Sequence, residues 1–124
     1  MRVRRFRVRI KPVEEALGEF KEAYLAATQG RPYSYRGGVY FTSLEAVRNV
    51  LTARRMLLLH TVREKCPRSI YALARLLGRN IKNVHADVQL LEELGLLTLV
   101  EGPKGRGAKQ PKATCDSIEV TIAI

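Results

Sequence analysis

The segment NIKNVHADVQLLEEL, residues 80–94, carries the kinds of polar side chain that proteins use to read DNA bases. Asn and Gln can each pair with adenine through two hydrogen bonds, Lys can donate to guanine, and a small Ala can touch a thymine methyl group. Helical spacing places an apolar stripe on one side, made of Ile81, Val84, Val88 and Leu91, with Leu94 at its margin. The residues pointing away from this stripe are Lys82, Asn83, His85, Ala86 and Gln89. Such a helix suits the major groove of duplex DNA, but an ordinary solvent-exposed helix face has the same pattern.

The elements before this helix help to decide between the two interpretations. Thr52 can cap one helix, and Ser69 can cap a second helix that Gly78 ends in a tight turn. Asn80 then caps residues 80–94, and Gly95 breaks that helix before a short apolar strand. The expected order from Thr52 onward is therefore helix, helix, turn, helix, strand.

A basic, turn-rich segment follows this strand. The sequence EGPKGRGAKQPKA, residues 101–113, holds three glycines, two prolines and four basic residues, which are Lys104, Arg106, Lys109 and Lys112. It cannot be a helix, and apolar residues flank it on both sides, so it predicts a long exposed hairpin loop over residues 102–112. A short helix, a tight turn, a polar helix and a basic hairpin together predict a helix-turn-helix with a DNA-contacting wing.

Residues 43–124 resemble the winged helix-turn-helix of small prokaryotic transcriptional regulators related in fold to the MarR group. The stretch SIYALARLLGRNIKNVHADVQLLEELGLLTL is similar to a family of proteins regarded as DNA-binding, frequent in archaea and also found in bacteria. In that family the helix reads roughly VHRDLxxLEELGL, and the chain ends in an alternating strand like IEVTI. The resemblance implies DNA binding, and for some bacterial members also an antitoxin role in which the protein represses its own operon.

The expected fold class is thus α+β, a winged helix-turn-helix over residues 43–124 with a strand-helix extension over residues 1–42. The expected function is sequence-specific binding of double-stranded DNA by a homodimeric transcriptional repressor that occupies a promoter. The residues expected to read bases are Lys82, Asn83, Ala86 and Gln89. The residues expected to hold phosphates or the minor groove are Ser69, Arg79, His85, Lys104, Arg106 and Lys109.

Leu90 departs from the family pattern, which has a polar or basic residue at this position. The helical wheel places Leu90 away from the apolar stripe. It either packs against the strand of the wing, the interpretation we favour, or marks a contact with another subunit or partner.

The N-terminal extension is expected to contain a strand, a helix and a hairpin. Residues 5–10 alternate apolar and basic side chains, which predicts a half-buried strand. Residues 13–27 have helical spacing after a proline, and Gly37 and Gly38 favour a hairpin turn. Ser43 is a good cap for a short helix that follows.

The arginines of the first strand have three interpretations. Arg5, Arg7 and Arg9 could steer DNA, bind an acidic protein partner, or keep an edge strand from pairing with other chains. The last segment, SIEVTIAI, also alternates strictly. These two terminal strands could pair with each other, within one chain or across a dimer, and the extension is the natural place for a dimer contact.

Composition narrows the classes of protein further. A formal net charge of +10 over 124 residues favours a polyanionic partner, and no apolar run is long enough for a signal peptide or a membrane span. We therefore expect a cytoplasmic protein without a membrane partner. Cys66 and Cys115 have no neighbours at metal-ligand spacing and are expected to be buried thiols.

Neither catalytic nor cofactor chemistry is indicated. His60 lies among apolar residues and is expected to be a core or boundary histidine, while Asp87 is expected to pair with Arg75 or Arg79. No Ser/His/Asp or Cys/His grouping, paired carboxylates or ligand cluster emerges from the sequence, so we expect no enzyme, no metal and no cofactor.

Two alternative functions remain open. The first is an antitoxin-type module that neutralises a small toxin protein through its N-terminal part and autoregulates its operon. The second is a winged helix that binds structured RNA or the ribosome.

Overall fold

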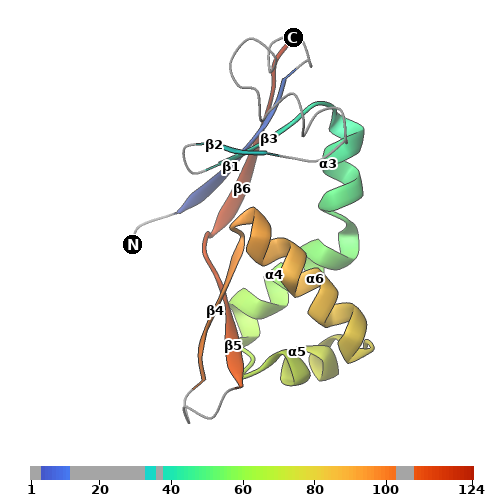
Figure 1. The fold of residues 1–124 in the computed structure, drawn as a ribbon, viewed down its shortest axis with the longest axis vertical. Coiled ribbons are helices and arrows are strands. Elements are labelled where there is room, and N and C mark those ends of the chain that lie inside the picture. The colour runs from blue at the N-terminus through green and yellow to red at the C-terminus, as the bar shows by residue number, and fades with distance from the viewer. Residues whose placement is uncertain (1–3, 12–32, 36–37, 103–107) are drawn as a thin grey trace. The chain divides into compact units, whose positions relative to one another are not determined.

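The computed structural model describes residues 4–11, 33–35, 38–102 and 108–124 (Figure 1). The chain forms two compact units, each described by itself below. Unit 1 comprises residues 1–52 together with the C-terminal residues 117–124, and unit 2 comprises residues 53–116. Helices and strands occur in both units, so the protein has a mixed α and β structure, as the sequence predicts.

Unit 1 is built on a four-stranded sheet with the order β2-β3-β1-β6. Its strands are β1 (Arg5–Ile10), β2 (Tyr33–Tyr35), β3 (Gly38–Phe41) and β6 (Ser117–Ile122). Strand β1 is parallel to both of its neighbours, β3 and β6, whereas β2 and β3 are antiparallel. The first strand of the chain is therefore held between segments that follow it much later in the sequence.

The alternation predicted for β1 is confirmed. The three apolar side chains of β1 are buried and the arginines between them are exposed. The edge-strand interpretation of these arginines is wrong, however, because β1 has a hydrogen-bonded neighbour on each side. Pairing of the two terminal strands occurs within the chain, with Phe6 opposite Ile118 and Val8 opposite Val120.

The predicted hairpin is confirmed by the antiparallel pairing of β2 with β3, in which Tyr35 lies opposite Gly38. Residues 36–37, between these two strands, and the helix expected over residues 13–27 lie outside the described residues. Helix α3 (Leu44–Val50) follows β3 and contacts it. The side chain of Ser43 caps α3, as predicted, by accepting a hydrogen bond from the Ala46 backbone N–H at 3.1 Å.

The described residues of unit 2 form three helices and a two-stranded antiparallel hairpin. The elements are α4 (Ala53–Lys65), α5 (Ile70–Leu77), α6 (Ile81–Leu94), β4 (Leu97–Glu101) and β5 (Lys109–Ala113). Helix α5 packs against α4 and α6, α6 contacts β4, and β5 contacts α4 and α5 (Figure 1). The hairpin thus closes the core that the three helices share.

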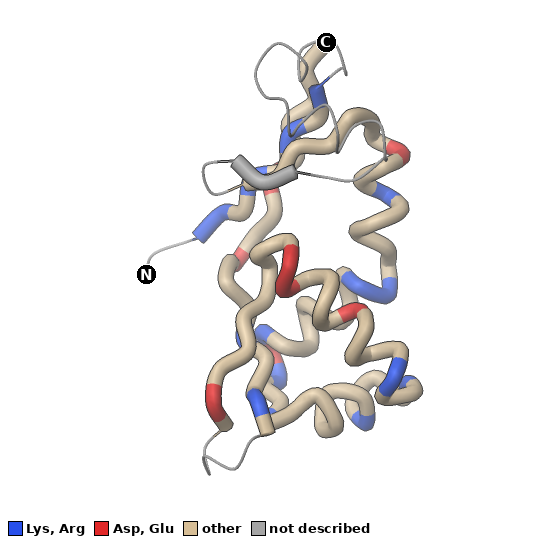
Figure 2. The backbone as a smooth tube through the Cα atoms, viewed as in Figure 1, with Lys and Arg blue, Asp and Glu red and all other residues tan. Residues whose placement is uncertain are grey.

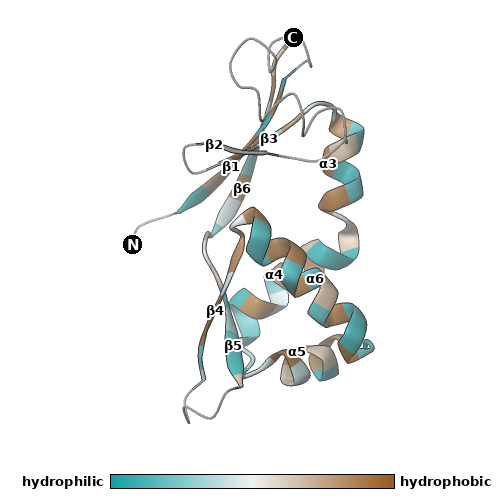
Figure 3. Cartoon of the chain, in the orientation of Figure 1, coloured by the Kyte–Doolittle hydropathy of each residue, from teal (hydrophilic) through white to brown (hydrophobic). Residues whose placement is uncertain are grey.

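Every element of unit 2 contributes to this core, and the apolar positions along each element appear brown in Figure 3. Helical spacing brings the buried leucines and valines of each helix to one side, where they exclude water from one another. The side chains with almost no exposed surface are Leu58, Leu73, Val84, Val88, Leu91, Leu96, Leu97 and Pro111.

The helix ends of unit 2 follow the local signals in the sequence. The Ser69 hydroxyl accepts from the Ala72 N–H at 3.0 Å, and the Asn80 side chain accepts from the Lys82 N–H at 2.8 Å. Gly78 ends α5 in the left-handed conformation with φ of 64°, which costs a residue without Cβ little. Gly78 and Asn80 therefore fix where α5 ends and where α6 begins.

The hairpin is confirmed, but its loop is shorter than predicted, because β5 begins at Lys109. The Thr114 N–H donates to the Leu96 carbonyl, so even-numbered residues of β5 direct their backbone groups toward β4. Pro111 lies at an odd position, where the missing N–H is not needed. A proline that suggested a loop therefore sits in a strand, with its ring fully buried.

The boundary expected at residue 43 differs from the compact units. Helix α3 belongs to unit 1 because it contacts β3, and β6 belongs there because it pairs with β1. The portion beyond Ser43 is thus divided between the two units.

Three side chains near α4 differ from the predictions. Cys66 is exposed and Cys115 is half-buried, so neither is the buried thiol expected, and His60 is exposed where a core or boundary histidine was expected. His60 lies on the outer side of α4, while Leu58, Leu59 and Val62 supply its buried side. Burial raises the pKa of the Cys115 thiol.

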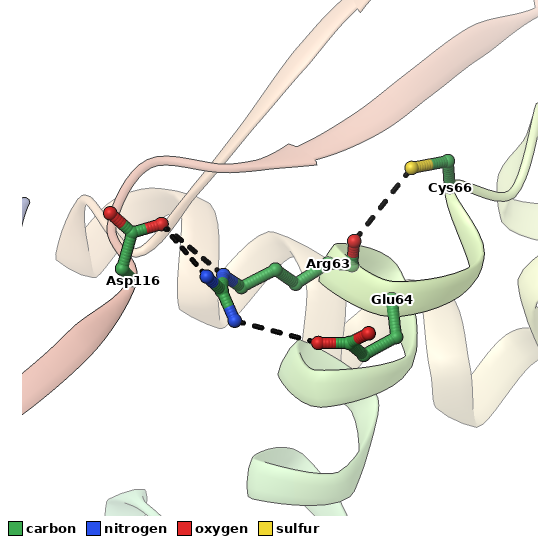
Figure 4. A network of polar contacts seen from close by, with 4 residues as sticks. All are labelled: Arg63, Glu64, Cys66 and Asp116. Atoms are coloured by element: carbon green, nitrogen blue, oxygen red, sulfur yellow. Dashed lines mark hydrogen bonds and ion pairs between the residues drawn. The ribbon is translucent and has the colours of Figure 1, made fainter. Parts of the chain in front are cut away.

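A polar network joins the C-terminal end of α4 to Asp116 (Figure 4). Arg63 donates to the Asp116 carboxylate at 3.2 Å and lies 3.5 Å from the Glu64 carboxylate. The Cys66 thiol donates to the Arg63 carbonyl at 3.7 Å, just after α4 ends. This network holds the residue before β6 against the end of the helix.

Candidate nucleic-acid interface

Helix α6 has a polar face that is open to solvent and an apolar face that is closed. Val84, Val88 and Leu91 are fully buried, which fixes the rotation of the helix about its axis. The exposed residues of the opposite face are Lys82, Asn83, His85, Ala86 and Gln89, all as predicted. Side chains at these spacings project from adjacent turns on a rigid support.

One apolar residue of α6 departs from the predicted stripe. Ile81 is 46% exposed, although its position on the wheel matches that of the buried residues. It is the first residue of the helix, so the core beneath Val84 does not extend as far as Ile81. The exposed apolar side chain therefore lies beside Lys82 on the same end of the helix.

Charge is distributed unevenly along α6. Lys82 lies in the first turn, whereas Asp87, Glu92 and Glu93 follow toward the C-terminal end, as the blue and red segments of Figure 2 show. The helix dipole adds partial positive charge at the N-terminal end. An anion approaching α6 is therefore attracted to the turn that carries Lys82 and Asn83.

Asp87 is a buried carboxylate held by two arginines. Arg79 Nη2 donates to Asp87 Oδ2 at 2.8 Å, and Arg55 Nε donates to Asp87 Oδ1 at 3.0 Å. The sequence correctly suggested Arg79 as a partner, while Arg55 was missed. Arg55 lies 32 residues earlier, on α4, and no local pattern connects it to Asp87.

The environment of Asp87 favours its ionised form. Burial is the largest single influence and would raise the pKa of Asp87. The hydrogen bonds and positive charges of Arg79 and Arg55 together outweigh it, so the pKa lies below its ordinary value. The carboxylate therefore stays charged at neutral pH and ties α6 to α4.

Arg79 faces inward and serves this cluster. Its side chain is 19% exposed, and Nη1 is buried with no hydrogen-bond partner among the described residues. This geometry supports a structural role for Arg79 and offers little support for the phosphate contact expected from the sequence.

The other residues expected to contact the DNA backbone differ in their exposure and in whether the structure describes them. Ser69 is half-buried at the start of α5, and its hydroxyl keeps a hydrogen to donate after accepting from Ala72. Lys109 is exposed at the start of β5, opposite Glu101. Lys104 and Arg106 fall in residues 103–107, outside the described part of the chain.

Leu90 is half-buried, although the helical wheel places it away from the apolar stripe. Helix α6 contacts β4, the first strand of the hairpin. Both facts are compatible with the packing interpretation, and its role stays a prediction.

The described residues contain neither a cluster suited to a metal ion nor a helix suited to a membrane span. Among them, no three His, Cys, Asp or Glu side chains gather where they could hold a metal ion. None of the described helices is both long and apolar enough to cross a membrane.

Comparison with known proteins identifies a family for this chain. A family model described as HVO_A0114 matches residues 50–120, which include all of unit 2. No curated protein and no solved structure gives a significant match. Because the match covers more than half of the chain, this protein belongs to the HVO_A0114 family.

Proposed function

We propose that unit 2 is a winged helix-turn-helix that binds double-stranded DNA, with α5 and α6 as the helix-turn-helix and β4-β5 as the wing. The observation that carries this proposal is the exposed row Lys82, Asn83, Ala86 and Gln89 on a helix whose other face is buried at Val84, Val88 and Leu91. A recognition helix needs both properties, because base contacts require side chains that reach outward from a support that does not move.

The four residues of this row have complementary chemistry. Lys82 donates to guanine, and Asn83 and Gln89 pair with adenine in the major groove. Ala86 lies between them and leaves room for the base edges to approach. The exposed acidic residues Glu92 and Glu93 lie farther along α6, where the helix leaves the groove.

Phosphate contacts come from residues around the recognition row, on α6 itself, at the start of α5 and on the wing. His85 is exposed beside the recognition row, Ser69 lies at the start of α5, and Lys109 lies at the wing. The net charge of +10 supplies a general attraction to the DNA backbone. Occupation of a promoter by such a protein represses transcription, and a homodimer would read two half-sites.

The experiment is a mobility shift with the DNA upstream of the protein's own gene against a scrambled duplex, at about 150 mM salt. A preference of about a hundredfold or more indicates sequence reading. Equal, salt-sensitive binding to both duplexes contradicts it, and tighter binding to structured RNA would favour the RNA alternative.

Two variants separate base reading from phosphate binding. Gln89→Ala should cost about 1–3 kcal/mol on the specific duplex and little on the scrambled one. Lys109→Ala should weaken binding to both and lower the salt slope by about one unit. Glu93→Ala, at an exposed site near the other end of α6, is the matched control and should not weaken either complex.

A second function, binding of an acidic protein partner by unit 1, is favoured by the exposed arginines of β1. Arg7 and Arg9 project from the middle of the sheet, where most proteins place uncharged residues. In this alternative the protein is an antitoxin that neutralises a small toxin. Co-purification with the product of the adjacent gene, lost in an Arg7→Ala, Arg9→Ala double variant, would support it.

A further inference from the structure

Strand β6 is the last strand of the described sheet, and one of its two edges faces β1. The Ser117 N–H donates to the Arg4 carbonyl at 3.3 Å, and the Ala123 N–H donates to the Ile10 carbonyl at 3.2 Å. Backbone groups alternate in direction along a strand. The N–H and C=O groups of Ile118, Val120 and Ile122 therefore point to the opposite edge of β6.

This outer edge has few of the features with which proteins prevent strands from pairing. Natural edge strands commonly carry lysine, proline or a bulge, or are very short. Strand β6 has six residues, SIEVTI, with no lysine, proline or glycine, and Glu119 is its single charged residue. By contrast, β2, at the other end of the described sheet, has three residues.

The apolar face of the sheet also extends onto this edge. Val8 and Ile10 of β1 are 1% and 7% exposed, whereas their register partners Val120 and Ile122 are 45% and 51% exposed. The row of apolar side chains thus continues past the covered part of the sheet.

We propose that the outer edge of β6 binds β6 of a second copy of this chain, antiparallel, about a two-fold axis at Val120. The sequence around Val120 is symmetric in kind, because Ile118-Glu119-Val120-Thr121-Ile122 places an isoleucine at each end and a polar residue on each side of the centre. Val120 then lies opposite the partner's Val120, and Ile118 lies opposite the partner's Ile122. The outward backbone groups of these three residues form six N–H···O=C hydrogen bonds.

Charge selects this register over a neighbouring one. About Val120, Glu119 lies opposite the partner's Thr121, and like charges are kept apart. A shift that centres the pair on Glu119 would place two carboxylates directly opposite each other, which is destabilising.

Arg9 of β1 offers a positive charge to Glu119 of the second copy. Arg9 is next to Thr121 in the register of β1 and β6. The partner's Glu119 therefore continues the row Arg9-Thr121 on the same face, about 10 Å from Arg9 across two strand spacings. Two long side chains of opposite charge can span that separation.

Pairing of this kind produces one continuous sheet from two chains and covers the exposed apolar row. It does not depend on DNA binding, since no residue of α6 takes part. Failure of the mobility-shift experiment and failure of this proposal are therefore distinguishable.

The test uses sedimentation of the full-length protein at about 10–100 μM with the variants Val120→Lys and Val120→Glu. Because residue 120 faces its own copy, each variant places two like charges together and should raise the dimer dissociation constant about tenfold or more. An equal mixture pairs Lys with Glu and should restore the dimer. Circular dichroism of each variant verifies that it remains folded.

A matched control changes an equally exposed apolar residue elsewhere. Leu57→Lys, on α4 of unit 2, should leave the dimer unchanged. A monomeric wild type overturns the proposal, as does a Val120→Lys variant whose dimer dissociation constant equals that of the wild type. Loss of the dimer in Leu57→Lys alone would assign the interface to unit 2 and overturn it as well.

Discussion

Unit 2 is one continuous stretch of chain, whereas unit 1 joins the two ends of the chain. In unit 2, the helix ends are set by neighbours within a few residues, as at Ser69, Gly78 and Asn80. In unit 1, the central strand β1 depends on β6, which follows more than a hundred residues later. Local capping and turn signals thus set the helix ends of unit 2, whereas pairing between distant strands sets the sheet of unit 1.

The largest loss of stability is expected at Asp87, where unit 2 itself depends on a contact between residues that are distant in sequence. Asp87→Ala leaves Arg55 and Arg79 without their shared carboxylate and should lower the free energy of unfolding by about 3 kcal/mol. Denaturant unfolding measures the loss, and hydrogen exchange should locate it in α4 and α6. A loss below about 1 kcal/mol would mean that capping and apolar packing suffice for unit 2.

A smaller loss is expected from a close contact in unit 1. A Cβ at residue 38 would lie 2.4 Å from the Arg7 carbonyl oxygen, which is backbone and cannot turn away. Gly38→Ala should therefore separate β1 from β3 and cost about 2 kcal/mol. Denaturant unfolding measures this cost, and hydrogen exchange shows where protection is lost. Loss of protection in β6 as well as in β3 would show that the sheet responds as a whole.

Gly78→Ala is the matched change in unit 2 and should cost about 1 kcal/mol. A Cβ there meets nothing within 4 Å, so the cost comes from the left-handed backbone alone. If Gly78→Ala were more damaging than Gly38→Ala, the ranking of distant contact above local conformation would be reversed.

The smallest expected effect is the change in the stabilising contribution of Asp87 in acidic solution. Because the pKa of Asp87 is lowered in the folded protein, its ionised form stabilises the fold above the pKa of the unfolded chain, near pH 4. This contribution is lost as pH falls through the folded pKa. The difference in unfolding free energy between wild type and Asp87→Asn should stay constant from pH 7 to about pH 5 and shrink in more acidic solution. A difference that changed between pH 7 and pH 5 would contradict the direction of the shift.

Much of unit 2 could be predicted from the sequence because its signals are local. Capping side chains, glycines at helix ends and the spacing of Val84, Val88 and Leu91 indicate the helices and the exposed face of α6 without knowledge of the rest of the fold. The hairpin was predicted for the same reason. The start of β5 was not, because Pro111 reads as a loop residue unless the direction of its backbone is known.

What could not be predicted depends on residues that are distant in sequence. Arg55 has no pattern linking it to Asp87, and the alternation of β1 shows which side chains are buried but not how many neighbours the strand has. The exposure of Cys66 and His60 likewise depends on which side of α4 the rest of unit 2 covers.

The pairing of β1 with β6 also has a consequence for the order of events during synthesis. The strand at the centre of the sheet leaves the ribosome before unit 2, and one of its two neighbours, β6, leaves after unit 2. Unit 2 is contiguous and can fold while translation continues, but β6 can pair with β1 only after all of unit 2 has been synthesised. A chain that stops before Ser117 would therefore carry a finished unit 2 and an N-terminal strand with one side of its backbone unpaired.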